Sequence, residues 1–479
     1  MLAGFKVANF LSFKEIQKFS MIRGRSEKHL EHIIGGKPEL LDRAVIYGPN
    51  SAGKSNFMTA VAYAQAIAIG KERHYLSRSS KVVKTLEKMS FDGSDNPISY
   101  FEFLISLDNQ LFSYGFEYDC RLKTFSTEWL VELFEDGSER EVFSISFENE
   151  NNNNISNNAD LELAALHKND SGNSFLSQSK DPTSVKIYAW ISRSLFVVVA
   201  SDGITTQNYY YEINSSEISE LFDLLKKLDT GIDGLHIDDP EAMYALADEY
   251  HDHYKGLIHL SRDELINRLT NDSSQYGEVT VNSYRTPFYL RDGALSIGLE
   301  KHIDEDNYET YRYDLDLEPD CIGNDVPVDF TMGFTHRPSH FEIPFEQESD
   351  GTKKILEILL AMFHSAYLND KGYTVLYDEF ECSIHVMLIK ELLRIYDQRR
   401  TDHNMQFITT THESRILTQL LYRNDEIWFV DSEENKGSTL YSLESFREAD
   451  EDSNLDLEYL KGRFGAIPAV IEFLKEGDE

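Results

Sequence analysis

Apolar and polar positions alternate through much of the first third of the chain, and this period of two is the pattern of half-buried β-strands. It predicts successive antiparallel strands within residues 99–148, in SYFEFLISL, QLFSYGFEYD, STEWLVELFE and REVFSISFE. Residues 5–13, FKVANFLSF, have similar β-type content and are predicted as one further strand. The run AVIY at 44–47 is apolar throughout, as expected of a short strand buried on both faces.

The rest of the chain changes between helical and strand-like patterns. A helix is predicted from Lys54–Ser55 through FMTAVAYAQAIAI. From about 161 to 272 the pattern is mostly helical, with SSEISELFDLLKKL and PEAMYALADEYHDHY as its main segments, and strands resume in GEVTVNSYRTPFYL and YETYRYDLDL. Later, helices and strands alternate as TKKILEILLAMFHSAYL, TVLYDE, HVMLIKELLRIYDQR and QFITTTH, before a closing strand pair, EIWFVD and STLYSL.

These patterns predict an α/β fold whose sheet is mixed or parallel and carries an antiparallel β subdomain. The chain is long enough for more than one domain. The expected parts are an N-terminal lobe at 1–147, an exposed Asn-rich loop at 148–160, a mainly helical insertion at 161–275, a β-rich return segment at 276–344 and a C-terminal lobe at 345–479.

The composition narrows the class of partner. Apolar residues make up 41% of the 479 residues, which is typical of globular proteins. The formal net charge is −37, from 83 acidic and 46 basic residues. Such a charge repels phosphate backbones unless basic residues cluster, so we do not expect broad nonspecific DNA binding by this chain alone. A locally basic groove or a basic partner stays open.

Cysteine usage and the N-terminal sequence bear on the compartment. Cys120, Cys321 and Cys382 are few and far apart, and their spacing matches neither a disulfide framework nor a metal site. MLAGFKVANF lacks the features of a targeting segment, and the apolar window SLFVVVAS is too short to span a bilayer. We expect a cytoplasmic protein without a membrane span.

The stretch GPNSAGKSN, residues 48–56, follows the strand AVIY and matches the phosphate-binding pattern G-x-x-x-x-G-K-[ST]. Glycines let the backbone approach a phosphate, and the following helix offers its positive end. Lys54 would neutralise phosphate charge, and the Ser55 hydroxyl would ligate Mg²⁺. The predicted ATP-binding residues are Gly48, Asn50, Ser51, Ala52, Gly53, Lys54, Ser55 and Asn56.

Two later strands end in chemically active residues. TVLYDE places Asp378 and Glu379 at a strand tip, where ligands bind in open α/β sheets. Asp378 is predicted to hold Mg²⁺ through water, and Glu379 to activate the attacking water as general base. The next strand ends at His412, which is predicted to contact the γ-phosphate.

SDGTKK precedes a long predicted helix and offers a further candidate anion site. It contains Ser349, Asp350, Gly351, Thr352 and Lys353. By local features it is equally well an ordinary helix cap, with hydroxyls that satisfy the first backbone N–H groups. Its functional meaning depends on the family that the other motifs indicate.

Together these motifs resemble the ABC-type ATPases of the SMC/RecF/OLD class. GPNSAGKSN resembles their Walker A, TVLYDE their Walker B with the catalytic glutamate, TTTH their switch histidine, and SDGTKK occupies the place of their signature. ANFLSFKE at 8–15 resembles the N-terminal strand of RecF-like proteins. FECSIH at 380–385 corresponds to the D-loop, through Ser383 and His385. The resemblance implies an ABC-ATPase head interrupted by the insertion.

The similarity is closest to ATPases of bacterial phage-defence systems, the AbiL/RloA-type proteins and the AriA subunit of PARIS. DGTKK, THESRIL, EIWFVD and YLKGRFGAIP carry it, over roughly 1–145 and 330–470. The sequence departs from the general pattern at Asp350, which replaces a signature glycine. No clear Q-loop glutamine is present, although Gln110 lies in the strand-rich region where one is expected.

The resemblance implies ATP and Mg²⁺ as cofactors and a head-to-tail homo-oligomer, a dimer or a ring of dimers, that sandwiches ATP between one Walker A and the partner's signature. It also implies control of a separate effector nuclease, of Toprim or similar type, and a phage-encoded trigger. Two alternatives remain: a RecF/SMC-like ATPase that clamps DNA, and a noncatalytic module that binds nucleotide only structurally. The net charge opposes the first, and Glu379 opposes the second.

Overall fold

The computed structural model describes residues 1–70, 97–146, 154–155, 173–199, 209–228, 230–237, 284–291, 294–297, 300–301, 332–338, 341–344, 347–363, 372–433, 436–446 and 454–467. It divides into two compact units. Unit 1 comprises Met1–Gly203, Ala366–Glu381 and His385–Glu479, and unit 2 comprises Ile204–Ser365 and Cys382–Ile384. Both ends of the sequence therefore contribute to unit 1.

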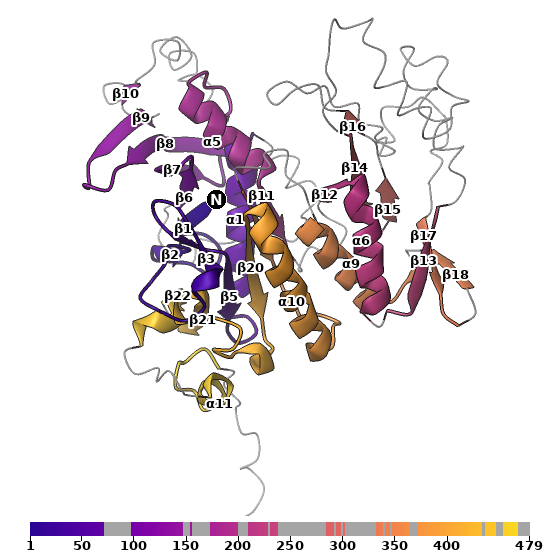
Figure 1. Cartoon of the computed structure of the whole chain (residues 1–479). Helices are drawn as coiled ribbons and strands as arrows, with labels where there is room; N and C mark the ends of the chain where they lie inside the picture. Colours follow the sequence, from indigo (N-terminus) through magenta and orange to yellow (C-terminus); the bar gives the residue numbers. More distant parts are fainter. Residues whose placement is uncertain are drawn as a thin grey trace, which may run out of the picture. The chain divides into compact units, whose positions relative to one another are not determined.

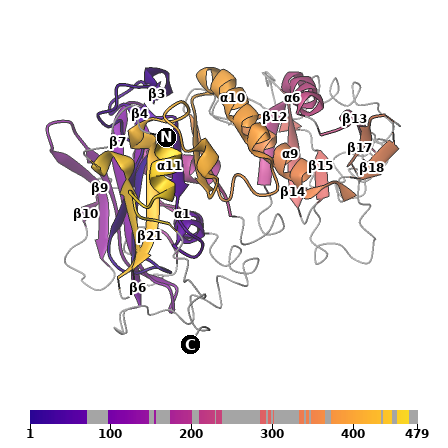
Figure 2. The ribbon, with the colours of Figure 1, turned by 90° about the horizontal axis from the view of Figure 1, so that it is seen from below.

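A seven-stranded antiparallel sheet forms one layer of unit 1 (Figure 2). In spatial order its strands are β10 (Asn154–Ile155), β9 (Glu139–Ser146), β8 (Thr124–Leu133), β7 (Gln110–Asp119), β6 (Ile98–Leu107), β1 (Leu2–Ala8) and β2 (Gln17–Ser20). The four consecutive antiparallel strands predicted from alternation are β6 to β9. The strand predicted over 5–13 ends earlier, because Asn9 and Leu11 both adopt left-handed backbone, with φ of 49°. Within the expected loop at 148–160, β10 instead extends the sheet.

A six-stranded sheet forms the second layer of unit 1. Its strands, in order, are β11 (Leu195–Val198), β19 (Tyr373–Tyr377), β20 (Met405–Thr411), β5 (Arg43–Tyr47), β21 (Ile427–Glu433) and β22 (Gly437–Ser442). Every neighbouring pair is parallel except β21 and β22. Because parallel strands end at the same edge, the segments after β5, β19 and β20 meet there.

The helix α1 (Lys54–Ala68) packs between the two sheets of unit 1 (Figure 1). Its residues are buried on nearly every side, as expected of a helix that is apolar all round. Phe57 contacts Phe5 of β1 and Phe19 of β2, with ring centroids 5.9 and 5.3 Å away. The helix α10 (Val386–His403) covers the other face of the parallel sheet. There the ring centroids of Tyr396 and Phe407 lie 5.5 Å apart. The loop that precedes α1 is thus attached to a helix that is buried on nearly every side.

Residues 173–199 correct the predicted extent of the helical insertion, which was expected to begin at 161. They form α5 (Pro182–Arg193) and β11, and both belong to unit 1. β11 is the edge strand beside β19. Gln65 of α1 fixes this segment, because its amide donates hydrogen bonds of 2.7 Å to the carbonyls of Ile191 and Leu195. The short run SLFVVVAS therefore completes the core sheet, a role that depends on contacts with distant strands.

Unit 2 contains both helices and strands among its described residues, and its strands between 284 and 344 lie in the segment that was predicted as β-rich. Its elements are β12 (Tyr209–Asn214), α6 (Ser215–Lys227), β13 (Ile232–Ile237), β14 (Tyr284–Arg291), β15 (Ala294–Ile297), β16 (Glu300–Lys301), β17 (Met332–His336), β18 (Phe341–Pro344) and α9 (Asp350–Phe363). α9 contacts α6 and β12. The segments PEAMYALADEYHDHY and YETYRYDLDL lie outside the described residues.

Short elements complete the description of unit 1. They are η1 (Leu30–His32), β3 (Ile33–Ile34), β4 (Leu40–Leu41), η6 (Ser414–Ile416), η7 (Asn424–Glu426), η8 (Leu443–Ser445) and α11 (Leu455–Leu460). Of these, η6 directly follows the segment that carries His412, and α11 contacts it.

A buried carboxylate joins the antiparallel sheet to the chain that leads into α5. Glu128 of β8 has no exposed surface. Its oxygens accept hydrogen bonds from Tyr114 Oη and Ser174 Oγ, each 2.9 Å away, and from the backbone N–H groups of Phe175 and Leu176 at 2.7 and 3.0 Å. Burial raises the pKa of Glu128 above its ordinary value. Four donors thus depend on one acceptor group.

We expect Glu128→Ala to lower the free energy of unfolding by about 3 kcal/mol, because buried donors would lose their acceptor. Denaturant titration of the purified chain measures this, with Glu139→Ala on the exposed start of β9 as the control. The raised pKa means that wild-type stability falls as pH rises from 4.5 through the folded-state pKa, and the variant should lack this dependence. Equal stability of both variants would contradict the expectation.

Candidate functional site

The turn between β5 and α1 has the backbone that a phosphate-binding loop requires. A Cβ at Gly48 would lie 2.3 Å from the carbonyl oxygen of Val430. Gly53 has φ of 119°, and a Cβ there would lie 2.4 Å from Ser438 Oγ. Only glycine fits these two positions without displacing the neighbouring backbone or side chain. Steric fit therefore explains why the motif has glycine at both positions.

Two residues from outside the motif, Ser12 and Ser438, hold the loop in place. Ser438 of β22 donates its hydroxyl hydrogen to the carbonyl of Ala52, and its N–H donates to the carbonyl of Ser12 at 2.7 Å. Asn56 Nδ2 donates to Ser12 Oγ at 2.8 Å. The left-handed turn that ends β1 thus positions Ser12 beneath the loop. The positions of Ser12 and Ser438 were not predicted as part of the site.

Lys54 points back along its own loop. Its exposed fraction is 5%, and Nζ donates to the carbonyls of Gly48 at 2.8 Å and Pro49 at 3.1 Å. Nζ also lies 3.3 Å from Nδ1 of His412. Burial lowers the pKa of Lys54 to about 8, and the nearby carboxylate of Asp378 opposes this shift. The ammonium is therefore under-solvated, and the strong negative charge of a triphosphate would stabilise it.

The end of β19 carries the two acidic residues predicted from the sequence. Asp378 is fully buried, and its Oδ1 accepts a hydrogen bond from the hydroxyl of Thr410 on β20. The N–H of Glu379 donates to the same hydroxyl at 2.8 Å. Glu379 has φ of 51°, a left-handed conformation that turns the chain sharply after the strand. Thr410 therefore fixes both acidic residues relative to β20.

His412 follows β20 and lies at the mouth of the loop, with part of its surface exposed. Desolvation lowers the pKa of its imidazole, and the neighbouring ammonium of Lys54 lowers it further. Its backbone N–H donates to Oε1 of Glu381, the next acidic residue after Glu379 along the turn. Lys54, Asp378 and His412, which the sequence placed at three separate strand ends, are thus close neighbours in unit 1.

The comparisons with known proteins address the class of this site. A family model described as "AAA domain, putative AbiEii toxin, Type IV TA system" matches residues 43–418, more than half of the chain. The chain belongs to this AAA-domain family. No curated protein matched the chain.

The search of solved structures found SMC head domains. They include the SMC head bound to the winged-helix domain of ScpA (12% identity, TM-score 0.35, covering 92% of this chain and 97% of the other) and the SMC head from Thermotoga maritima (11%, 0.31, 92% and 98%). The SMC head with an extended coiled coil, bound to a ScpA domain derived from Pyrococcus furiosus, has 12% sequence identity and a TM-score of 0.33. That match covers 92% of this chain and 96% of the other. The observed parallel sheet with an antiparallel β subdomain confirms the α/β fold class predicted for this ATPase family.

The acidic residues and Ser55 fit a magnesium ion, the metal on which ATPases of this kind depend. Oδ2 of Asp378 is buried and has no hydrogen-bond partner among the described residues, so it could accept from a metal-bound water. Ser55 lies half-buried in the first turn of α1. Mg²⁺ would supply positive charge to the phosphate oxygens. The remaining loop residues Asn50 and Ser51 are exposed, and Ala52 is buried.

The predicted signature begins a helix in unit 2. Ser349 caps α9, because its Oγ accepts from the N–H of Thr352 at 3.1 Å and lies 2.8 Å from the hydroxyl of Thr352. A Cβ at Gly351 would lie 2.8 Å from the carbonyl oxygen of Ser383, so the signature and D-loop segments pack closely. Asp350 is exposed at the helix start, and Lys353 donates its N–H to the carbonyl of Ser349 at 3.0 Å. The ordinary capping role is thus present.

The predicted D-loop residues have distinct local structures. Ser383 is exposed and has φ of 61°. His385 is the N-cap of α10 in unit 1, where its Nδ1 accepts from the N–H of Met387 at 3.3 Å. Both residues follow the turn that begins at Glu379, so the Walker B strand leads directly into this segment.

Gln110, the glutamine considered for the Q-loop, lies at the wrong end of its sheet. β1 runs from Leu2, beside Ile105, to Ala8, beside Tyr100, and the loop partner Ser12 follows its Ala8 end. Gln110 pairs with Leu107 at the other end of these strands, roughly 20 Å away at the usual rise of a β-strand. Gln110 is therefore excluded as a ligand of the nucleotide loop.

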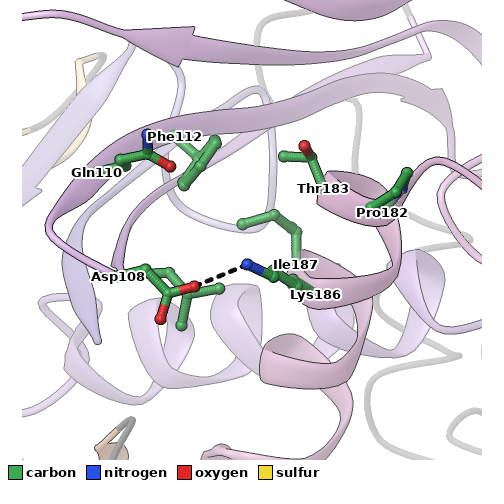
Figure 3. Close-up of a pocket in the computed structure, with 8 residues that line it drawn as sticks. Asp108, Gln110, Phe112, Pro182, Thr183, Lys186 and Ile187 are labelled. Carbon is green, nitrogen blue, oxygen red and sulfur yellow. Dashed lines mark hydrogen bonds and ion pairs between the residues drawn. The ribbon is translucent and has the colours of Figure 1, made fainter. Parts of the chain in front are cut away.

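Gln110 instead lines a small cavity between the β6–β7 hairpin and the start of α5 (Figure 3). Leu107, Phe112 and Ile187 form its apolar wall. Lys186 and Asp108 close one side with an ion pair of 2.9 Å. The charged groups are already paired with each other, so the cavity has no evident binding chemistry.

Among the described residues, no helix is long and apolar enough to cross a bilayer.

Proposed function

We propose that the chain binds and hydrolyses ATP with Mg²⁺, at a composite site that a second copy completes with its signature. One observation supports this most strongly: the phosphate loop, Asp378 and His412 surround Lys54 within hydrogen-bonding or close electrostatic range. Parallel strands bring these residues to one edge of the sheet, and an ammonium, a carboxylate and an imidazole are the groups that a magnesium–triphosphate ligand requires there. The capped helix α9 offers its N-terminus for the partner's nucleotide.

In this proposal each residue has one task. The N–H groups of the loop and Lys54 bind the β- and γ-phosphates, while Ser55 and Asp378 hold the metal and its water. Glu379 accepts a proton from the attacking water. His412 contacts the γ-phosphate and reports its presence. Because ATP binds the closed head-to-tail dimer better than the open form, occupancy shifts the population toward the dimer.

We expect the purified chain to hydrolyse ATP only with Mg²⁺, and its molar mass to double or rise to higher multiples when ATP is added. Phosphate release and light scattering measure the two effects. EDTA, which removes Mg²⁺, should abolish phosphate release. A purified chain that neither binds nor hydrolyses ATP would contradict the proposed function.

We further propose that this ATPase is the cytoplasmic control subunit of an abortive-infection-type antiviral system. The family description names a putative AbiEii toxin and a type IV toxin–antitoxin system, which supports a role in such systems. The chain would hold a separate effector nuclease, of Toprim or similar type, until a phage-encoded trigger acts. The net charge of −37 suits a basic protein partner better than DNA.

A phage plaque assay on cells carrying this gene and its neighbours tests the biological role. Protection that depends on both this chain and a neighbouring nuclease gene is expected. Tight, salt-dependent binding of duplex DNA by the isolated chain would instead favour the RecF/SMC-like clamp.

A further inference from the structure

We propose that Glu381 is a positioning residue that holds the switch histidine, His412, at the nucleotide. The proposal rests on the proposed ATPase function and adds a residue that the motifs do not identify. Glu381 lies on the turn after β19, and its Oε1 accepts the backbone N–H of His412, the first residue after β20. One side chain therefore ties together the ends of two adjacent parallel strands.

The other oxygen of this carboxylate explains why the contact matters. Oε2 of Glu381 is buried and lacks a hydrogen-bond partner among the described residues. This carboxylate lies close enough to both Lys54 and His412 to interact with them electrostatically. Burying a carboxylate oxygen without a hydrogen-bond donor destabilises the folded state. Its presence beside Lys54 and His412 therefore fits a functional role at this charged site.

The backbone between the two acidic residues makes this geometry possible. The left-handed conformation of Glu379, with φ of 51°, reverses the chain, and the N–H of Phe380 donates to the carbonyl of Thr410 at 3.1 Å. These contacts bring Glu381 back over the end of β20. Glu379 itself remains the candidate base, because it directly follows Asp378 at the end of β19.

Glu381 is also two residues from Ser383, whose carbonyl packs against Gly351 of the signature. The chain therefore links the residue that holds His412 to the segment that supports the signature helix.

Two substitutions distinguish a positioning role of Glu381 from a role as metal ligand or general base. Glu381→Ala removes the acceptor for the His412 N–H, and we expect kcat to fall about 10- to 100-fold while KM for ATP stays within about threefold. Glu381→Gln keeps a carbonyl oxygen that can accept the same bond, so its kcat should stay within about fivefold of wild type. If Glu381→Gln is as slow as Glu381→Ala and needs more Mg²⁺, the residue is a metal ligand or base and the proposal is overturned.

A double-substitution cycle tests whether Glu381 acts through His412. In a His412→Ala background, Glu381→Ala should lower kcat by less than about twofold, because the side chain that it positions is already gone. Full additivity of the two losses would overturn the proposal. Thermal unfolding of every variant is measured alongside, and Glu381→Gln decides the question if Glu381→Ala does not fold.

Glu413→Ala is the matched control. Its carboxylate lies in the next turn, accepts the N–H of Arg415 at 2.9 Å and pairs with the guanidinium of the same residue. We expect kcat within about twofold of wild type. Absence of ATP hydrolysis by the wild-type chain refutes the proposed function, whereas unchanged kcat in Glu381→Ala refutes only this inference.

Discussion

Lys54→Ala is expected to weaken ATP binding by at least about 100-fold. The ammonium lies within the loop, bonded to the carbonyls of Gly48 and Pro49, and no other described lysine or arginine is a recorded neighbour of that position. A charge-assisted hydrogen bond to phosphate contributes up to about 3 kcal/mol, which corresponds to roughly that factor. Calorimetric titration with a nonhydrolysable ATP analogue measures the affinity.

Lys18→Ala is the control for this variant, because Lys18 is exposed on β2 of the same unit and lies outside the site. It should bind as wild type does. In a phage assay, Lys54→Ala should also abolish protection. Retained nucleotide affinity or full protection would contradict the assigned role.

The pH dependence of binding gives a second measurement on Lys54. Burial lowers its pKa to about 8, and bound phosphate should raise that pKa again. Binding then takes up a proton at alkaline pH, so affinity should fall as pH rises above about 8. Lys54→Ala should lose this dependence.

Glu379→Gln is expected to slow ATP hydrolysis by about 10²- to 10⁴-fold, the usual contribution of a general base. The substitution conserves volume, and the backbone N–H that bonds Thr410 Oγ1 at 2.8 Å is unaffected. Nucleotide affinity should therefore stay within a few fold, and an ATP-bound dimer should accumulate. Single-turnover hydrolysis and light scattering with ATP measure both results.

Glu391→Gln is the matched control, because this half-buried residue of α10 pairs with Arg394 and lies outside the site, and it should hydrolyse ATP at the wild-type rate. If Glu379→Gln also turns over normally, Glu379 is not the base. Slow turnover without accumulation of dimers would instead separate hydrolysis from assembly.

Much of the site could be predicted because its main residues end consecutive buried strands. AVIY, TVLYDE and QFITTTH are short apolar runs, and parallel strands bring their carboxyl ends to one edge. Asp378 and His412 follow from that rule, and Lys54 follows from the phosphate-binding pattern after AVIY. Their catalytic roles remain proposals, but their proximity is a consequence of strand direction.

Glu381 and Ser438 could not be found in the same way. Glu381 reaches His412 only because Glu379 adopts a left-handed turn, and a glutamate gives no local signal for that conformation. Ser438 reaches the loop because β22 pairs with β21, far from Gly53 in sequence. Gln110 shows the converse, since a plausible residue type lies at the far end of the right sheet.

The sequence by itself determined the strand periods, the nucleotide loop and the order of the motifs, because these depend on residues that are near one another along the chain. The tertiary structure alone decided that residues 195–198 complete the parallel sheet and that residues 173–199 belong to unit 1. It also decided where β1 ends and which side chains support the loop. Those outcomes depend on packing between distant segments, such as Gln65 with the α5–β11 connection, and local patterns carry no information about such pairs.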